Sequence, residues 1–215
     1  MTIASSINYD EIEKENLKKL LARCELSRIS NKLDEESRNG LVILIIIPAE
    51  LYLDSNMESV KFFLDHGFEG VYISFQRPFK NLSLFFERQG VNINKLFIID
   101  GTTKFSKEVQ DKNPRCAYIS LDFEINDIIQ KVRSSLSKLN GKKRFVFVDS
   151  LTTMALYESM SETMKFPEYL IRKTRIKEFE DVTFVFNVAE NLTQKRYIQN
   201  IAIFADEHIH LGLCT

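Results

Sequence analysis

One short stretch, FVFVDSLTTM (residues 145–154), combines a buried strand with residue types that handle metal-bound phosphates. Four apolar residues precede Asp149, and the hydroxyl residues Ser150, Thr152 and Thr153 follow it closely. A carboxylate in this position holds a magnesium-bound water in phosphate-handling enzymes. The same aspartate could instead cap the helix that comes next. The residues by themselves leave both interpretations open.

A second stretch, ELYLDSNM (residues 50–57), connects the apolar run LVILIII to a helical pattern. Connections of this kind often bind phosphate at a helix N-terminus. This one has no glycine and no lysine, and Glu50, Asp54 and Glu58 would repel a triphosphate. Ser55 and Glu58 have the spacing of a capping box, in which each side chain bonds to a free backbone N–H. We therefore expect a self-capped structural turn.

The histidines and cysteines are candidates for a metal site. His208 and His210 alternate in an extended pattern near Cys214, so the two imidazoles would share one face. A zinc site needs further ligands placed by geometry. We expect ordinary strand packing and no metal site. Cys24, Cys116 and Cys214 are widely spaced, which favours reduced thiols over disulfides.

The C-terminal third is locally basic, in residues 172–177 and at Lys195 and Arg196. Tyr197 beside these cations could stack on a base. The net charge of the whole chain is −1, however, which favours a solvated helix face. We do not expect a nucleic-acid partner.

Methionines are concentrated in MALYESMSETMKF (residues 154–166), at Met154, Met160 and Met164. Methionine forms adaptable binding surfaces, and it also fills gaps in a core. Both interpretations stay open from the sequence.

The composition is that of an ordinary globular protein: 215 residues, 44% hydrophobic and 27% charged. The N-terminus lacks the basic start and apolar core of a secretory signal. The run LVILIII is too short to span a membrane. We expect a cytoplasmic protein without a membrane span.

Short apolar runs alternate with helical patterns, which predicts an α/β fold with a mostly parallel sheet. The region 122–141 should form a helix that begins at a capping Asp122 and stops at Gly141, and Pro167 should open a second helix within residues 161–181. In parallel sheets the functional site lies at the carboxyl ends of the strands. The runs are 41–47, 71–75, 96–99, 117–120, 145–148, 183–188 and 209–213.

Over residues 39–213 the chain resembles the RecA-like ATPases, and most closely their KaiC-like branch, which is common in archaea. The resemblance rests on Gly40 before LVILIII, and on FFLDHGFEGVYISF, FERQGVNINKLFIIDG, FVFVDSLTTM and IAIFADEHIHL, in this order and spacing. It implies a three-layer α/β domain, ATP bound at the carboxyl edge of the sheet, and assembly into rings or filaments with nucleotide between subunits.

The resemblance also implies where a phosphate loop, G-x-x-x-x-G-K-T, would lie. Counting back from Gly67, which matches a family glycine, places it on residues 50–57. None of the four signature residues is present. The replacements are Glu50 and Ser55 for the two glycines, Asn56 for the lysine and Met57 for the magnesium-binding threonine.

A second part of the family's machinery is changed as well. Relatives carry catalytic glutamates directly after the second strand, and here Gln76 and Arg77 stand in those places. Glutamine can orient a water but cannot accept its proton. Asp149 and Ser150 match the magnesium-associated end of the fifth strand. We expect no catalytic residues, and no cofactor: ATP with magnesium is possible but not expected.

We expect a helical N-terminal extension (residues 1–38) and a KaiC/RecA-like domain (residues 39–215). Leu17, Leu20, Leu21, Cys24 and Ile29 should form one face of the extension, packed on its own domain or on a second chain.

The predicted function is a pseudo-ATPase that acts as a protein-interaction or regulatory module, with a protein partner or self-association. One alternative is a weak ATP-binding or ATP-hydrolysing protein completed by a partner subunit. Another is a nucleic-acid-binding RecA-like module.

Overall fold

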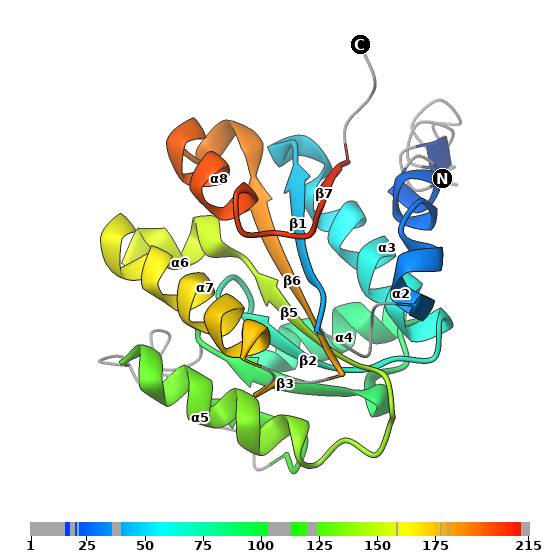
Figure 1. Cartoon of the computed structure of the whole chain (residues 1–215). Coiled ribbons are helices and arrows are strands. Elements are labelled where there is room, and N and C mark those ends of the chain that lie inside the picture. The colour runs from blue at the N-terminus through cyan, green and yellow to red at the C-terminus, as the bar shows by residue number, and fades with distance from the viewer. Residues whose placement is uncertain are drawn as a thin grey trace, which may run out of the picture.

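The computed structural model of the chain places seven strands in one sheet, in the order β4-β3-β2-β5-β6-β1-β7, with every pairing parallel (Figure 1). Each of the seven predicted runs overlaps a strand, the last one only at residues 209–210, and the predicted α/β fold is confirmed. The structure describes residues 16–17, 20, 22–35, 40–102, 113–119, 124–157, 159–176, 178–179 and 181–211. The strands are β1 (Val42–Ile47), β2 (Glu69–Ser74), β3 (Leu96–Asp100), β4 (Cys116–Tyr118), β5 (Arg144–Asp149), β6 (Val182–Ala189) and β7 (Glu207–His210).

Helices cover both faces of the sheet, which makes the fold three-layered (Figure 1). Strand β1 shows why its run is apolar throughout: Ile43 and Ile45 belong to one buried cluster, and Val42 and Leu44 to the other. Parallel strands covered on both faces have no solvent-facing positions. The helices and 3-10 turns are α2 (Ser30–Glu35), η2 (Ala49–Leu51), α3 (Tyr52–Asp65), α4 (Phe79–Arg88), η3 (Ile93–Lys95), α5 (Ile125–Leu136), α6 (Leu151–Tyr157), α7 (Met160–Arg175), η4 (Glu190–Leu192) and α8 (Lys195–Ala202).

Helix α3 ends at a glycine. Gly67 has φ +81°, in the left-handed region that favours glycine. In this conformation the Phe68 N–H reaches back to the Phe63 carbonyl at 3.1 Å, which is the pattern of a glycine-terminated helix. The chain is thereby redirected into β2.

Two expected helix boundaries were wrong. Helix α5 begins after Glu124, whose N–H donates to the Asp127 carboxylate at 3.2 Å, and it ends at Leu136, well before Gly141. Asp122 lies outside the described residues. Pro167 does not open a helix but lies inside α7, which is continuous. A proline inside a helix costs stability. In α7 this cost is offset by the burial of one face of the helix.

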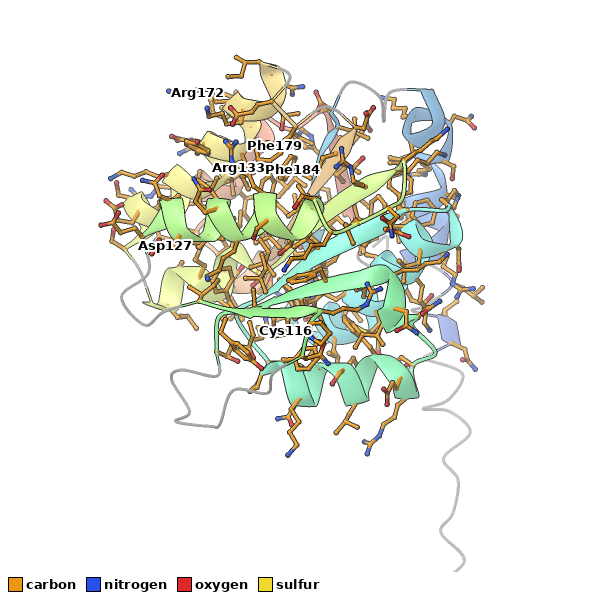
Figure 2. The ribbon with its side chains drawn as sticks, turned by 90° about the horizontal axis from the view of Figure 1, so that it is seen from below. Cys116, Asp127, Arg133, Arg172, Phe179 and Phe184 are labelled. Carbon is orange, nitrogen blue, oxygen red and sulfur yellow. The ribbon has the colours of Figure 1, made fainter. Side chains whose placement is uncertain are left out.

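Helix α5 is also joined to the start of β6. Figure 2 shows Arg133 beside Phe179 and Phe184. The guanidinium of Arg133 lies 5.3 Å from the Phe179 ring centroid and pairs with Glu178. The rings of Phe179 and Phe184 meet edge to face at 5.4 Å. These contacts hold α5 against the sheet.

The described part of the N-terminal segment packs on its own domain, but not through the expected face. Ala22, Leu26, Ile29 and Leu33 join the core under α3. Of the predicted set, Ile29 is buried, whereas Leu17, Leu20 and Cys24 are exposed. Leu21 lies outside the described residues. The division into an extension and a domain stays a prediction.

In the part of the chain that the structure describes, no helix combines the length and apolarity needed to cross a membrane.

Candidate functional site

The carboxyl ends of β1, β2, β5 and β6 surround one buried carboxylate. Asp149, the last residue of β5, is 3% exposed. Its Oδ1 accepts hydrogen bonds from the Tyr52 hydroxyl at 2.7 Å and from Asn56 Nδ2 at 2.9 Å. Its Oδ2 accepts from the Tyr72 hydroxyl at 2.5 Å. Both carboxylate oxygens are therefore bonded to side chains of the same chain.

The bonds continue into β6. Asn187, which is fully buried, donates from Nδ2 to the Asn56 Oδ1. Its own Oδ1 has no hydrogen-bond partner among the described residues. We call this set the Asp149 network; it consists of Tyr52, Asn56, Tyr72, Asp149 and Asn187.

The environment shifts the pKa of all three acids in the network. Burial raises the pKa of Asp149, although the hydrogen bonds from Tyr72, Tyr52 and Asn56 oppose this shift. Burial, and then the charge of Asp149, raise the pKa of Tyr52 and of Tyr72 well above the ordinary tyrosine value. Both phenols therefore remain protonated donors at neutral pH.

The predicted phosphate-loop positions lie in a helix rather than in a loop. Ser55, Asn56 and Met57 are buried inside α3, and Glu50 is exposed in η2. The predicted capping box was wrong, because α3 begins at Tyr52. Tyr52 and Asn56 lie one helical turn apart, and both donate hydrogen bonds to Asp149. These bonds favour a helical conformation of the segment that we expected to be a turn.

The other half of the expected capping box has a different role. The Glu58 carboxylate pairs with Arg23 at 2.5 Å and with Lys61 at 3.3 Å. Glu58 thus connects α3 to the N-terminal segment instead of bonding to a helix N-terminus.

These residues do not fit a magnesium triphosphate. A phosphate loop presents free backbone N–H groups and a lysine to the phosphates. Here the N–H of Leu51 bonds to the Pro48 carbonyl, and the N–H of Tyr52 bonds to the Ala49 carbonyl. Asn56 bonds to Asp149 in place of a lysine, and the Met57 side chain has no oxygen for a metal.

The residues after β2 also bond within the protein. Gln76 Nε2 donates to the Thr153 hydroxyl at 3.0 Å, and the Arg77 guanidinium lies 5.3 Å from the Phe85 ring centroid. The Ser150 hydroxyl accepts from the Thr153 N–H at 3.1 Å, so Ser150 caps α6. Asp149 does not cap this helix, contrary to one of the two interpretations.

No protein-family model matches the sequence, and no curated protein matches it. Solved structures do. An uncharacterized protein of Pyrococcus horikoshii, in complex with an unknown peptide, has TM-score 0.60 and 15% identity over 79% of this chain and 76% of its own. A KaiC-like protein of Pyrococcus horikoshii has TM-score 0.51 and 15% identity over 80% and 70%. The flagellar accessory protein FlaH of Methanocaldococcus jannaschii has TM-score 0.52 and 13% identity over 82% and 76%.

The chain has a RecA-like α/β fold. At these identities the likeness concerns the fold alone. Within this fold, the Asp149 network lies at the carboxyl edge of the sheet.

A separate cavity of about 390 Å3 opens between β7, the end of β1 and α8. Its lining includes Ile46, Glu190, Lys195, His208 and His210. His208 is bonded through Nε2 to the Ala202 carbonyl at 2.7 Å. The described residues contain no group of three or more histidines, cysteines and acids placed to hold a metal, and Cys214 lies outside them.

The basic cluster is largely paired. Lys173 bonds to Glu178 at 2.5 Å and Arg175 to Asp206 at 2.6 Å. Arg196 stacks on Tyr197 with 4.8 Å to the ring centroid. Lys195, Arg196 and Tyr197 lie in the first turn of helix α8, and Lys177 lies outside the described residues.

The methionine question is answered for two residues. Met154 and Met164 are buried in the core on the α5–α7 face of the sheet. Both fill the core rather than forming a binding surface.

Sequence reasoning missed Tyr52, Tyr72 and Asn187. Asn187 had a signal, since it is the one amide inside the apolar strand VTFVFNVA. A lone buried amide requires a partner. The sequence gives no such signal for Tyr52 and Tyr72, because tyrosine is not unusual in a strand or at the start of a helix.

Proposed function

We propose that this chain is a non-catalytic, KaiC-like pseudo-ATPase that acts as a protein-interaction or regulatory module in the cytoplasm. The observation that carries the proposal is the bond from Asn56 to Asp149. By the resemblance, these positions correspond to the phosphate-binding lysine and the magnesium-associated aspartate. In this chain they bond to each other.

The geometry supports the loss of nucleotide chemistry in two further ways. Asp149 would have to release three donors before it could hold a metal-bound water. Buried donors left without an acceptor cost about 1–3 kcal/mol each, which would weaken any nucleotide affinity. Gln76, in the place of a base, cannot accept a proton.

Two observations support a role in protein interaction, and neither of them identifies a particular partner. One structural neighbour is described in complex with an unknown peptide, and this chain exposes large apolar side chains directly after α7 and after α8. A contiguous exposed apolar surface is typical of a protein-binding site.

The partner-completed ATPase and the nucleic-acid module receive less support. A partner could contribute an arginine or a base, but it cannot replace Asn56 inside α3. Three cations of the basic cluster, Lys173, Arg175 and Arg196, already have acidic or aromatic partners.

Calorimetry with magnesium ATP tests the proposal, with Asp149→Asn as the matched variant. We expect no binding tighter than about 1 mM to either protein, and no rise in melting temperature at about 5 mM nucleotide. Micromolar binding that Asp149→Asn weakens would contradict the proposal, because it would assign the carboxylate to a metal-nucleotide site.

A further inference from the structure

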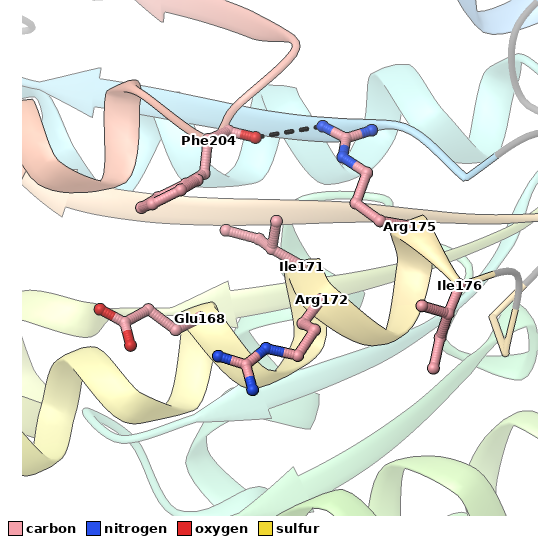
Figure 3. Close-up of a pocket in the computed structure, with 6 residues that line it drawn as sticks. All are labelled: Glu168, Ile171, Arg172, Arg175, Ile176 and Phe204. Atoms are coloured by element: carbon pink, nitrogen blue, oxygen red, sulfur yellow. Dashed lines mark hydrogen bonds between the residues drawn. The ribbon is translucent and has the colours of Figure 1, made fainter.

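The face formed by α7 and the end of α8 contains an apolar groove of about 390 Å3 (Figure 3). Its floor is Ile171, which is 5% exposed. Figure 3 shows Glu168 and Arg172 along one side of α7, and Phe204 across from them. The lining residues are Glu168, Ile171, Arg172, Arg175, Ile176 and Phe204.

Large apolar side chains are exposed around this groove. Ile176 is 62% exposed and Phe204 is 48% exposed, and both line the groove; Ile203, which precedes Phe204 in the chain, is 75% exposed. Single exposed apolar residues are common on protein surfaces, but a cluster next to a groove marks an interaction site. The face therefore presents both apolar projections and an apolar depression.

The charges on this face fall into two kinds. Arg175 is engaged within the chain, since it donates to the Phe204 carbonyl at 3.1 Å and pairs with Asp206 at 2.6 Å. Glu168 and Arg172 are exposed and form no hydrogen bond or ion pair with any described residue. They lie one helical turn apart on α7 and carry opposite charges.

We propose that this face binds the same face of a second copy of the chain about a twofold axis. In a twofold interface, residue i contacts residue j and j contacts i. Glu168 of each copy would then face Arg172 of the other, which gives two ion pairs. Ile203 and Phe204 of each copy would cover the groove of the other.

The charge pattern favours a second copy over an unrelated peptide. An acidic segment would satisfy Arg172 and meet Glu168 with like charge, and a basic segment would do the reverse. The same face in antiparallel orientation satisfies both. The inference rests on the interaction role proposed above but not on the loss of the nucleotide site.

The test is sedimentation of the full chain from about 1 to about 200 µM, a range in which a small interface associates reversibly. We expect a monomer–dimer equilibrium. Phe204→Asp should weaken association by at least about tenfold, because it places a charge in the apolar centre. Lys165→Glu, a reversal on α7 outside the groove, should leave the equilibrium unchanged.

Charge reversals test the twofold geometry. Glu168→Arg alone and Arg172→Glu alone each create two like-charge contacts, and each should weaken association by about threefold or more. A mixture of these two single variants should restore it, because the mixed dimer contains two opposite-charge pairs. The double variant carrying both reversals should also dimerise like the original chain.

A chain that stays monomeric throughout this range overturns the proposal. So does a mixture of the single variants that associates no better than either alone. Circular dichroism and melting temperature establish that each variant is folded. Nucleotide binding plays no part in these measurements, so this proposal and the proposed function can fail separately.

Discussion

At the carboxyl edge of the sheet the buried polar groups bond to one another, whereas on the α7–α8 face Glu168 and Arg172 form no ion pair with any described residue and lie beside exposed apolar side chains. Asp149 is 3% exposed and accepts three hydrogen bonds from its own chain. Glu168 and Arg172 form no hydrogen bond with any described residue. The first region lies where parallel α/β sheets commonly bind ligands, and the second is a helical surface outside that position.

The two regions differ in how much they would gain by binding another molecule. A buried network with satisfied donors gains little from a ligand, because binding would first break internal bonds. An exposed apolar groove with unpaired charges gains from any surface that covers it. Under the two proposals above, binding takes place on the α7–α8 face and not at the carboxyl edge of the sheet. Four experiments can break or sharpen this contrast.

The largest effect should come from removing the centre of the network. Asp149→Ala leaves the Tyr52 and Tyr72 hydroxyls and the Asn56 amide without their acceptor, and should cost about 3 kcal/mol or more in the free energy of unfolding. Urea denaturation measures this. Tyr72→Phe, which removes one donor, should cost about 1–2 kcal/mol. A loss below about 1 kcal/mol for Asp149→Ala would mean that the network is not structural.

Restoring the family's residues should fail to restore chemistry. The double variant Asn56→Lys, Met57→Thr should show no ATP turnover, because the loop remains helical and Gln76 cannot act as a base. It should lose about 1–3 kcal/mol, since Lys is larger than the buried Asn. Phosphate release and urea denaturation measure the two effects. Turnover above the background of the unaltered chain would show that the machinery survives elsewhere.

The pH dependence of stability should report on Asp149. Burial raises the folded-state pKa of this carboxyl above its ordinary value of 3.8. The folded protein therefore binds the proton more tightly than the unfolded chain, and this contribution to stability is lost as pH rises through the folded-state pKa. Asp149→Asn cannot titrate, so its stability relative to the original chain should rise with pH in that range and then level off.

Urea midpoints of both proteins from about pH 4 to about pH 8 give this comparison. A difference that stays constant with pH would show that Asp149 is not the titrating group.

The smallest effect should come from the other region. Phe204→Ser is expected to change the stability of the monomer by no more than about 0.5 kcal/mol, because the side chain is half exposed. Dilute protein must be used, so that association does not contribute. A loss comparable to that of Asp149→Ala would place Phe204 in the core and remove it from the interaction surface.

The sequence by itself predicted an α/β fold with a mostly parallel sheet, because a strand such as β1, covered on both faces, is apolar throughout and stands out from amphipathic helices. Residue type and spacing also pointed to Asp149, and the resemblance to the RecA-like ATPases pointed to Asn56 and Gln76. The signals for the strands and for Asp149 are local, since each depends on residues within one element.

Only the tertiary structure decided what those residues bond to. The partners of Asp149 come from positions 52, 56 and 72, and Asn187 joins them from β6. No spacing rule connects residues so far apart, because the crossovers of the sheet bring them together. The same holds for the start of α3 at Tyr52 and for the unpaired state of Glu168 and Arg172. A capping motif predicts a helix start only where long-range hydrogen bonds do not favour another, and a charge is unpaired only in relation to everything that surrounds it.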